Sequence, residues 1–176
     1  LLWFGWFGFN AGSALGASPS AALAFVTTML APAATLVVWM LLDALRSGTP
    51  TAVGAATAIV VGLVAVTPAA GFIGPMSALA LGAIAAVPSY FCLILRAKTG
   101  LDDSLDVVAA HGVGGTVGAL LTGVFANEAL NGIAKANGAL FGNPEQLVAQ
   151  ATAVLAAIVY SGVMSFVLLK IVGAIV

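Results

Sequence analysis

Residues 51–95 decide the fold, and they read TAVGAATAIVVGLVAVTPAAGFIGPMSALALGAIAAVPSYFCLIL, without one acidic or basic side chain. A membrane-spanning helix needs about 20 apolar residues, so this run is long enough for two crossings. Thr67, Pro68 and Gly71 interrupt it, because proline restricts the residue before it and glycine favours turns. We therefore expect a hairpin of two helices, over residues 50–66 and 75–95.

The rest of the chain is as apolar as this run. Of its 176 residues, 62% are hydrophobic and 6% are charged, whereas a soluble domain carries about 25% charged residues. We therefore expect the lipid bilayer to be its solvent. A net charge of −1 without a basic run argues against a nucleic-acid partner. The lone Cys92 excludes a disulfide within the chain.

Capping and turn residues mark the remaining helices. Gly48 suits the end of one helix, and Thr49 and Pro50 suit the cap and first position of the next. The acidic stretch at residues 103–106 resembles a capping box that opens a further helix. We expect an all-α, polytopic transmembrane bundle with helices over residues 1–14, 20–45, 50–66, 75–95, 103–125 and 144–175.

The first segment and the basic residues indicate how the chain sits in a bilayer. Residues 1–14 are too short to span it and lack a starting methionine, so we expect a chain truncated at its N-terminus. Basic residues fall mainly on one side of the alternation, namely Arg46, Arg96, Lys98 and Lys170, against Lys135 on the other. The positive-inside rule then places both chain ends in the cytoplasm of an inner or plasma membrane.

A single histidine, His111, lies inside the fifth predicted helix and is followed by glycines at 112, 114 and 115. A titratable ring is costly at membrane depth, so it usually lines a cavity or a substrate path. On a regular helix His111 shares a face with Val107, Gly115, Gly118 and Thr122. Hydrogen bonding to a neighbouring helix, with no further role, is the alternative for this ring.

The first segment combines aromatic and small residues. Trp6, Phe9 and Ser13 have the spacing of one helix face, and Gly5, Gly8 and Gly12 form a neighbouring stripe. Aromatic faces beside a hydroxyl suit a small cation with N–H donors, and the glycine stripe favours close packing on another helix. An interfacial aromatic belt is the alternative explanation.

Most enzymatic functions lack their residues. One histidine and one cysteine cannot supply a zinc site, and we expect neither a metal nor a cofactor. An intramembrane serine hydrolase needs a serine and a histidine on different helices. The pattern around His111 fits that of rhomboid-like proteases, but the serine motif is incomplete at both Ser13 and Ser161. We therefore do not expect an enzyme.

Three segments in series resemble the ammonium transporter family (Amt/Mep/Rh), and its bacterial-type Amt branch in particular. They are GWFGFNAGS at residues 5–13, VTPAAG at 66–71, and DDSLD at 102–106 with HGVGG at 111–115 and TGVFA at 122–126. The resemblance implies an eleven-helix fold built from inverted repeats, and a homotrimer with one pore per subunit. It places residues 1–176 at helices six to eleven, so the N-terminal half is missing.

The same resemblance implies roles for individual residues. Phe9 matches a gate phenylalanine, Ser13 the serine that accepts a hydrogen bond from ammonium, and His111 the second histidine of a pore pair. Trp6, Leu2 and Val107 match pore-wall positions. The function implied is transport of ammonium or ammonia through a hydrophobic pore. A hydrolase, an ammonium sensor and an inert membrane fragment stay open as alternatives.

Overall fold

The computed structural model describes residues 1–131 and 136–176, and these residues are helical with turns and loops between. The elements are α1 (Leu2–Gly12), α2 (Pro19–Ser47), α3 (Ala52–Val66), α4 (Pro75–Arg96), the π-helix η1 (Val108–Val113), α5 (Gly114–Phe125), the 3₁₀-helix η2 (Ala139–Phe141) and α6 (Glu145–Ile175). Four helices are long and apolar enough to cross a membrane: α2, α4, η1 with α5, and α6. The all-α transmembrane bundle is therefore confirmed.

The turn and cap residues act largely as expected. Gly48 ends α2 in the left-handed conformation at φ 78°, and Pro75 occupies the first turn of α4. Thr49 and Pro50 were expected to start the next helix, and that prediction is wrong. Thr51 is the cap, because its extended backbone brings its hydroxyl within 2.9 Å of the Gly54 amide, which donates to it.

The core lies where α2, α3, α4 and η1–α5 meet, and small residues let their backbones approach. A methyl group on Gly62 would overlap Pro32, and one on Gly82 would overlap the Ala31 carbonyl. Thr35 donates a hydrogen bond of 2.9 Å to the carbonyl of Gly82, so a buried hydroxyl also joins α2 to α4. Close backbone approach thus joins α3 and α4 to α2.

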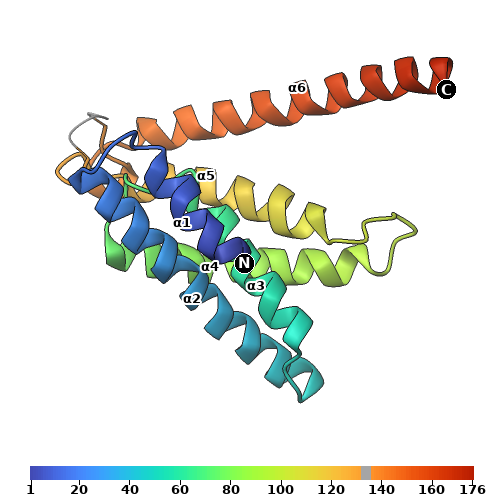
Figure 1. Cartoon of the computed structure of the whole chain (residues 1–176), viewed down its shortest axis with the longest axis horizontal. Helices are drawn as coiled ribbons and strands as arrows, with labels where there is room; N and C mark the ends of the chain where they lie inside the picture. The colour runs from blue at the N-terminus through green and yellow to red at the C-terminus, as the bar shows by residue number, and fades with distance from the viewer. Residues whose placement is uncertain (132–135) are drawn as a thin grey trace.

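The helices alternate in direction along one long axis (Figure 1). The α2–α3 turn, the α4–η1 connection and the C-terminus lie towards one end, which carries Arg46, Arg96 and Lys98. Lys135, expected at the other end, lies outside the described residues. The N-terminus lies midway along the bundle, as a helix too short to span would place it.

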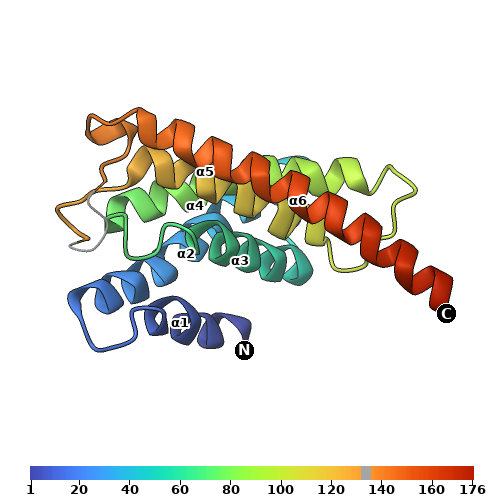
Figure 2. The same cartoon turned by 90° about the horizontal axis from the view of Figure 1, so that it is seen from above.

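The two outermost helices lie on opposite sides of the molecule (Figure 2). α1 lies beside α2 at one side, while α6 crosses over α5 at the other and its last turns extend beyond the remaining helices. No residue of α6 is buried. Both helices therefore present wide apolar surfaces that the described chain does not cover.

Candidate functional site

The aromatic segment forms an apolar hollow on the outer side of α1. Leu1, Leu2, Gly5, Trp6 and Phe9 line this space of about 490 Å³. The rings of Trp6 and Phe9 meet edge to face, with centroids 6.0 Å apart. Trp6, Phe9 and Ser13 were expected to share one face. The structure brings Trp6 and Phe9 together with Leu2, but it places Ser13 at a separate space.

Three polar side chains attach α1 to the bundle. The Trp6 indole N–H donates to the Thr67 hydroxyl at 2.8 Å, and that of Trp3 donates to the Thr28 carbonyl at 3.1 Å. The Asn10 amide donates to the Thr28 hydroxyl at 2.9 Å and is buried. Sequence reasoning missed Asn10, although an amide within an apolar helix is a signal of interhelical hydrogen bonding.

The glycine stripe of α1 does not pack as expected. Side chains added at Gly5, Gly8 or Gly12 would meet no atom within 4 Å. The prediction of close helix packing along this stripe is therefore wrong for the described chain. Directional hydrogen bonds, and the stacking of Phe7 on Phe25 at 4.3 Å, hold the other side of α1 to α2.

Ser13 lies apart from the Trp6–Phe9 hollow. Its hydroxyl donates to the Phe9 carbonyl at 2.7 Å, and its side chain is exposed just past the end of α1. It borders a smaller space of about 160 Å³ together with Asn10, Ser20 and Phe72. Because its O–H is used within α1, the lone pairs of its oxygen stay available as acceptors.

His111 sits on the π-helix η1 and is exposed. It lines a groove of about 390 Å³ between η1–α5 and α6, together with Gly115, Ala119, Ile158 and Ser161. Among the described residues it makes no hydrogen bond. The ring is therefore free to accept or donate a hydrogen bond to a solute in the groove.

The face expected for His111 is only partly correct. Gly115 lines the same groove, but Gly118 and Thr122 are buried, and a methyl group on Gly118 would overlap the Ala65 carbonyl of α3. A π-turn places its bonds five residues apart instead of four, so the α-helical spacing does not extend across η1. Val107, 45% exposed, precedes η1 and does not line the groove.

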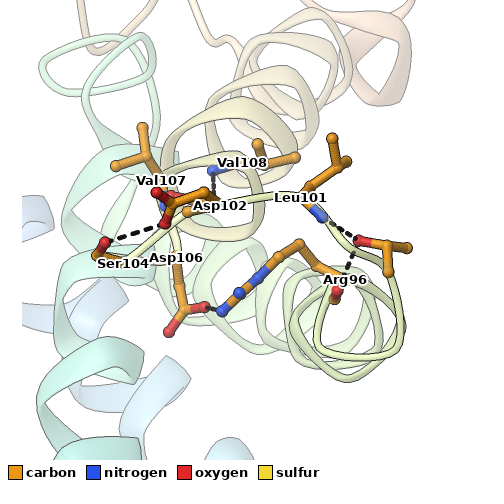
Figure 3. Close-up of polar contacts among 9 residues, drawn as sticks. Arg96, Leu101, Asp102, Ser104, Asp106, Val107 and Val108 are labelled. Carbon is orange, nitrogen blue, oxygen red and sulfur yellow. Dashed lines mark hydrogen bonds and ion pairs between the residues drawn. The ribbon is translucent and has the colours of Figure 1, made fainter.

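The connection before His111 is rich in polar contacts (Figure 3). The Asp103 carboxylate accepts hydrogen bonds of 2.9 Å from the Val107 and Val108 amides. The bond from Val108 is the largest cause that lowers the pKa of the Asp103 carboxyl below its ordinary value, and the bond from Val107 is the next. The helix was expected to start at residue 103, but it starts at Val108, and the Asp103 side chain caps it. The Asp106 carboxylate pairs with Arg96, the last residue of α4.

The candidate residues do not meet in one cavity of the described chain. α1 contacts α2 and α3 but neither η1 nor α5. Trp6 and Phe9 line one hollow, Ser13 a second and His111 a third. In the residues that the structure describes, no group of three or more metal-ligating side chains occurs.

Comparison with known proteins gives these positions a context. The family model described as Ammonium Transporter Family matches residues 1–176. An ammonium transporter of Aquifex aeolicus is 49% identical over 100% of this chain, which spans 41% of that relative's length. The crystal structure of Saccharomyces cerevisiae Mep2 superposes with a TM-score of 0.89 at 36% identity, over 96% of this chain and 39% of that one.

A structure described as a sensor Amt protein is also similar. Its TM-score is 0.83 at 34% identity, and the match covers 96% of this chain and 42% of that one. The matches thus extend over nearly all of this chain and about two fifths of each relative. On the family model and these similarities, the chain belongs to the ammonium transporter family, as a partial segment of it.

Proposed function

We propose that residues 1–176 form the C-terminal part of an ammonium transporter and supply one half of its pore. The observation that carries this proposal is the family match along the whole chain, which spans only about two fifths of its relatives. The uncovered glycine stripe of α1 supports it, because such a face fits a bundle that continues into further helices. The full-length protein would have eleven helices in inverted repeats and assemble as a homotrimer.

The aromatic hollow on α1 is the proposed entry to the pore. Trp6 and Phe9 offer ring faces and edges to a small cation, and Leu2 completes the wall. The Ser13 oxygen, whose proton is already donated to Phe9, accepts an N–H bond from ammonium at the outer vestibule. Because Ser13 lines a separate space, its hydroxyl acceptor and the cation–π contact in the hollow act at successive positions.

Beyond Phe9 the solute passes as ammonia. A charge is expensive in an apolar bore, so the cation loses its proton near the gate. His111, which has no hydrogen-bond partner in the described chain, either accepts a bond from the solute or relays the separated proton. Val107, just before η1, adds apolar wall. The proposed membrane is the cell membrane, with the C-terminal end of this segment in the cytoplasm.

Two substitutions of His111 in the full-length protein test this mechanism. His111→Ala removes both hydrogen-bonding nitrogens, whereas His111→Gln keeps a donor and an acceptor that do not titrate. Uptake of labelled methylammonium and current are recorded together, with Thr152→Val on the exposed side of α6 as the control. We expect His111→Ala to change uptake, current or both, while the control matches the parent. Parent-like uptake and current in His111→Ala would remove the ring from the mechanism.

A serine hydrolase is the second candidate function, because one observation favours it. Ser161 of α6 lines the same groove as His111, so a serine and a histidine from different helices do face one space. A fluorophosphonate probe distinguishes the two functions: a hydrolase is labelled covalently at Ser161, and that label disappears in Ser161→Ala. A transporter gives no labelling at this residue.

The sensor and the inert fragment are distinguished by transport itself. Similarity to a sensor Amt structure does not separate a sensor from a transporter, because both share the fold. A sensor would bind ammonium with little net uptake. An inert fragment would show neither binding nor uptake until joined to the rest of its pore. Uptake by the full-length protein that depends on His111 supports the transporter.

A further inference from the structure

The segment between α4 and His111 holds an unusual set of contacts. Asp106 is one of the two described non-glycine residues with positive φ, at 53°. Its amide donates to the Asp103 carbonyl at 3.2 Å, and its own carbonyl accepts from the Ala110 amide at 2.9 Å. Its carboxylate pairs with Arg96, the last residue of α4 (Figure 3). Backbone and side chain of Asp106 are thus both engaged.

Asp103 completes the arrangement from the other side. Both carboxylate oxygens are used, one on the Val107 amide and the other on the Val108 amide. These are the amides at the start of η1 that have no partner further back in the helix. Asp103 therefore fixes the residue at which η1 begins. The Asp106–Arg96 pair fixes the path of the chain that leads into η1.

The far end of the same turn is also fixed. Gly114 and Gly118 lie against α3, where a methyl group on Gly118 would overlap the Ala65 carbonyl. Between these two fixed points the chain is a π-helix, which takes about one residue more per turn than an α-helix. His111 lies within this turn, so its direction depends on the turn remaining in that form.

We propose that Arg96, Asp103 and Asp106 form a clasp that keeps residues 108–113 in the π-form and thereby points His111 into its groove. They are positioning residues, since none of them lines that groove. Loss of the clasp lets the segment relax to α-helical spacing, which turns the residues before Gly114 by about 100° relative to α5. The functional meaning of the clasp rests on the proposed role of His111, but its structural action does not.

Cysteine labelling reads the direction of this turn without using transport. Single cysteines replace exposed His111 or buried Ala110, which is 2% exposed, in full-length protein in which Cys92 and any cysteine outside residues 1–176 are alanine. With the clasp intact, we expect a membrane-permeant maleimide to label position 111 about tenfold faster than position 110. In the Asp106→Asn or Arg96→Ala background the order reverses, because the turn has rotated.

Matched variants separate the clasp from general damage. Lys98→Ala removes an exposed charge from the same connection and should leave both labelling rates unchanged. Arg96→Lys keeps the ion pair and should retain the parent order. Asp106→Gly relieves the positive φ but breaks the pair, so it should behave like Asp106→Asn while folding more readily. An unchanged order of labelling in all the pair-breaking variants overturns the clasp.

Methylammonium uptake by the same variants, with His111 restored, tests the functional part. We expect uptake to fall about tenfold or more in Asp106→Gly and Arg96→Ala, because displacements of about 1 Å carry penalties of this order or larger. Arg96→Lys should recover most of it. Reversed labelling with unchanged uptake supports the clasp and counts against the proposed role of His111. The two failures are therefore distinguishable.

Discussion

Asp103 shows how one partly exposed carboxylate sets the start of a membrane helix. Its two acceptor bonds from Val108 and Val107 replace partners that a helix start otherwise lacks. The ionised form makes these bonds best, and nearby Arg96 also favours it, so the pKa of Asp103 is lowered in the folded protein. The cap is therefore a feature of the charged side chain, and its strength depends on pH.

This residue predicts a specific pH dependence of stability. A carboxyl whose pKa is lower when folded stabilises the fold at pH values above its unfolded pKa, and this stabilisation is lost as the pH falls through the folded value. We expect the full-length protein to melt at a higher temperature than Asp103→Asn at pH 7. The two should converge as the pH falls below about 4, the ordinary range of aspartate.

Thermal unfolding of both proteins across the pH range measures this difference. Asp102→Asn, which changes a neighbouring exposed acid, is the matched control and should follow the parent. A constant gap between the parent and Asp103→Asn from pH 7 to acid pH would show that the charge of Asp103 has no part in the cap.

The helices and their turns were largely readable from the sequence, because their causes are local. The hairpin break at residues 67–71 and the left-handed Gly48 follow from proline and glycine chemistry. The π-turn at Val108–Val113 was not readable, since no residue type marks an i to i+5 bond. The sequence also did not reveal that the glycine stripe of α1 is uncovered in the described chain. Residue spacing identifies a face of small residues but not what packs against that face.

Packing of α5 on α3 predicts a large effect from a small substitution. Gly118→Ala adds a methyl group where the Ala65 carbonyl lies, and a backbone atom cannot move aside without separating the helices. We expect a loss of about 1–3 kcal/mol in the free energy of unfolding. Equilibrium unfolding of the full-length protein in a mild detergent measures it.

Gly162→Ala on α6 is the matched control for this substitution. Among the described residues, no atom lies within 4 Å of its added methyl group, and alanine favours the helix by up to about 1 kcal/mol. Its stability should equal or exceed that of the parent. Equal stabilities of Gly118→Ala and Gly162→Ala would mean that α3 and α5 do not approach as closely as described.

The whole molecule places its chain turns at two ends, and this arrangement predicts sidedness. The α2–α3 turn and the α4–η1 connection share one end with Arg46, Arg96 and Lys98, and the loop before α6 lies at the other (Figure 1). Under the positive-inside rule the basic end is cytoplasmic. Cysteines at Ser47 and Thr99 should therefore be shielded from an impermeant maleimide added to intact cells, and one at Asn143 should be labelled.

Labelling after cell lysis controls for reactivity, because all three sites are exposed or partly exposed in the structure. Cys92 and any cysteine outside residues 1–176 are replaced by alanine, so that only the introduced thiol reports. The opposite pattern would invert the proposed orientation. Labelling of Ser47 and Asn143 from the same side would contradict the alternation of the helices itself.

At this scale the sequence predicts the membrane bundle but not the joining of its candidate residues. Composition and segment lengths suffice for the bundle, since they follow from the thickness of the bilayer. Trp6 and His111 were expected along one conduit, yet they line separate spaces on helices that do not touch. Whether the two spaces join into one path depends on the protein surfaces that lie opposite them. No local pattern in residues 1–176 describes those surfaces.

The attachment of α1 through Trp3, Trp6 and Asn10 has a practical consequence for handling the protein. Such bonds hold well where hydrocarbon offers no competing partner, and they weaken where water and polar surfactant heads reach the joint. Short-chain detergents should therefore detach α1 before the other helices and displace its aromatic side chains. Extraction in a long-chain maltoside, followed by reconstitution into nanodiscs, is therefore the better choice before any ligand titration.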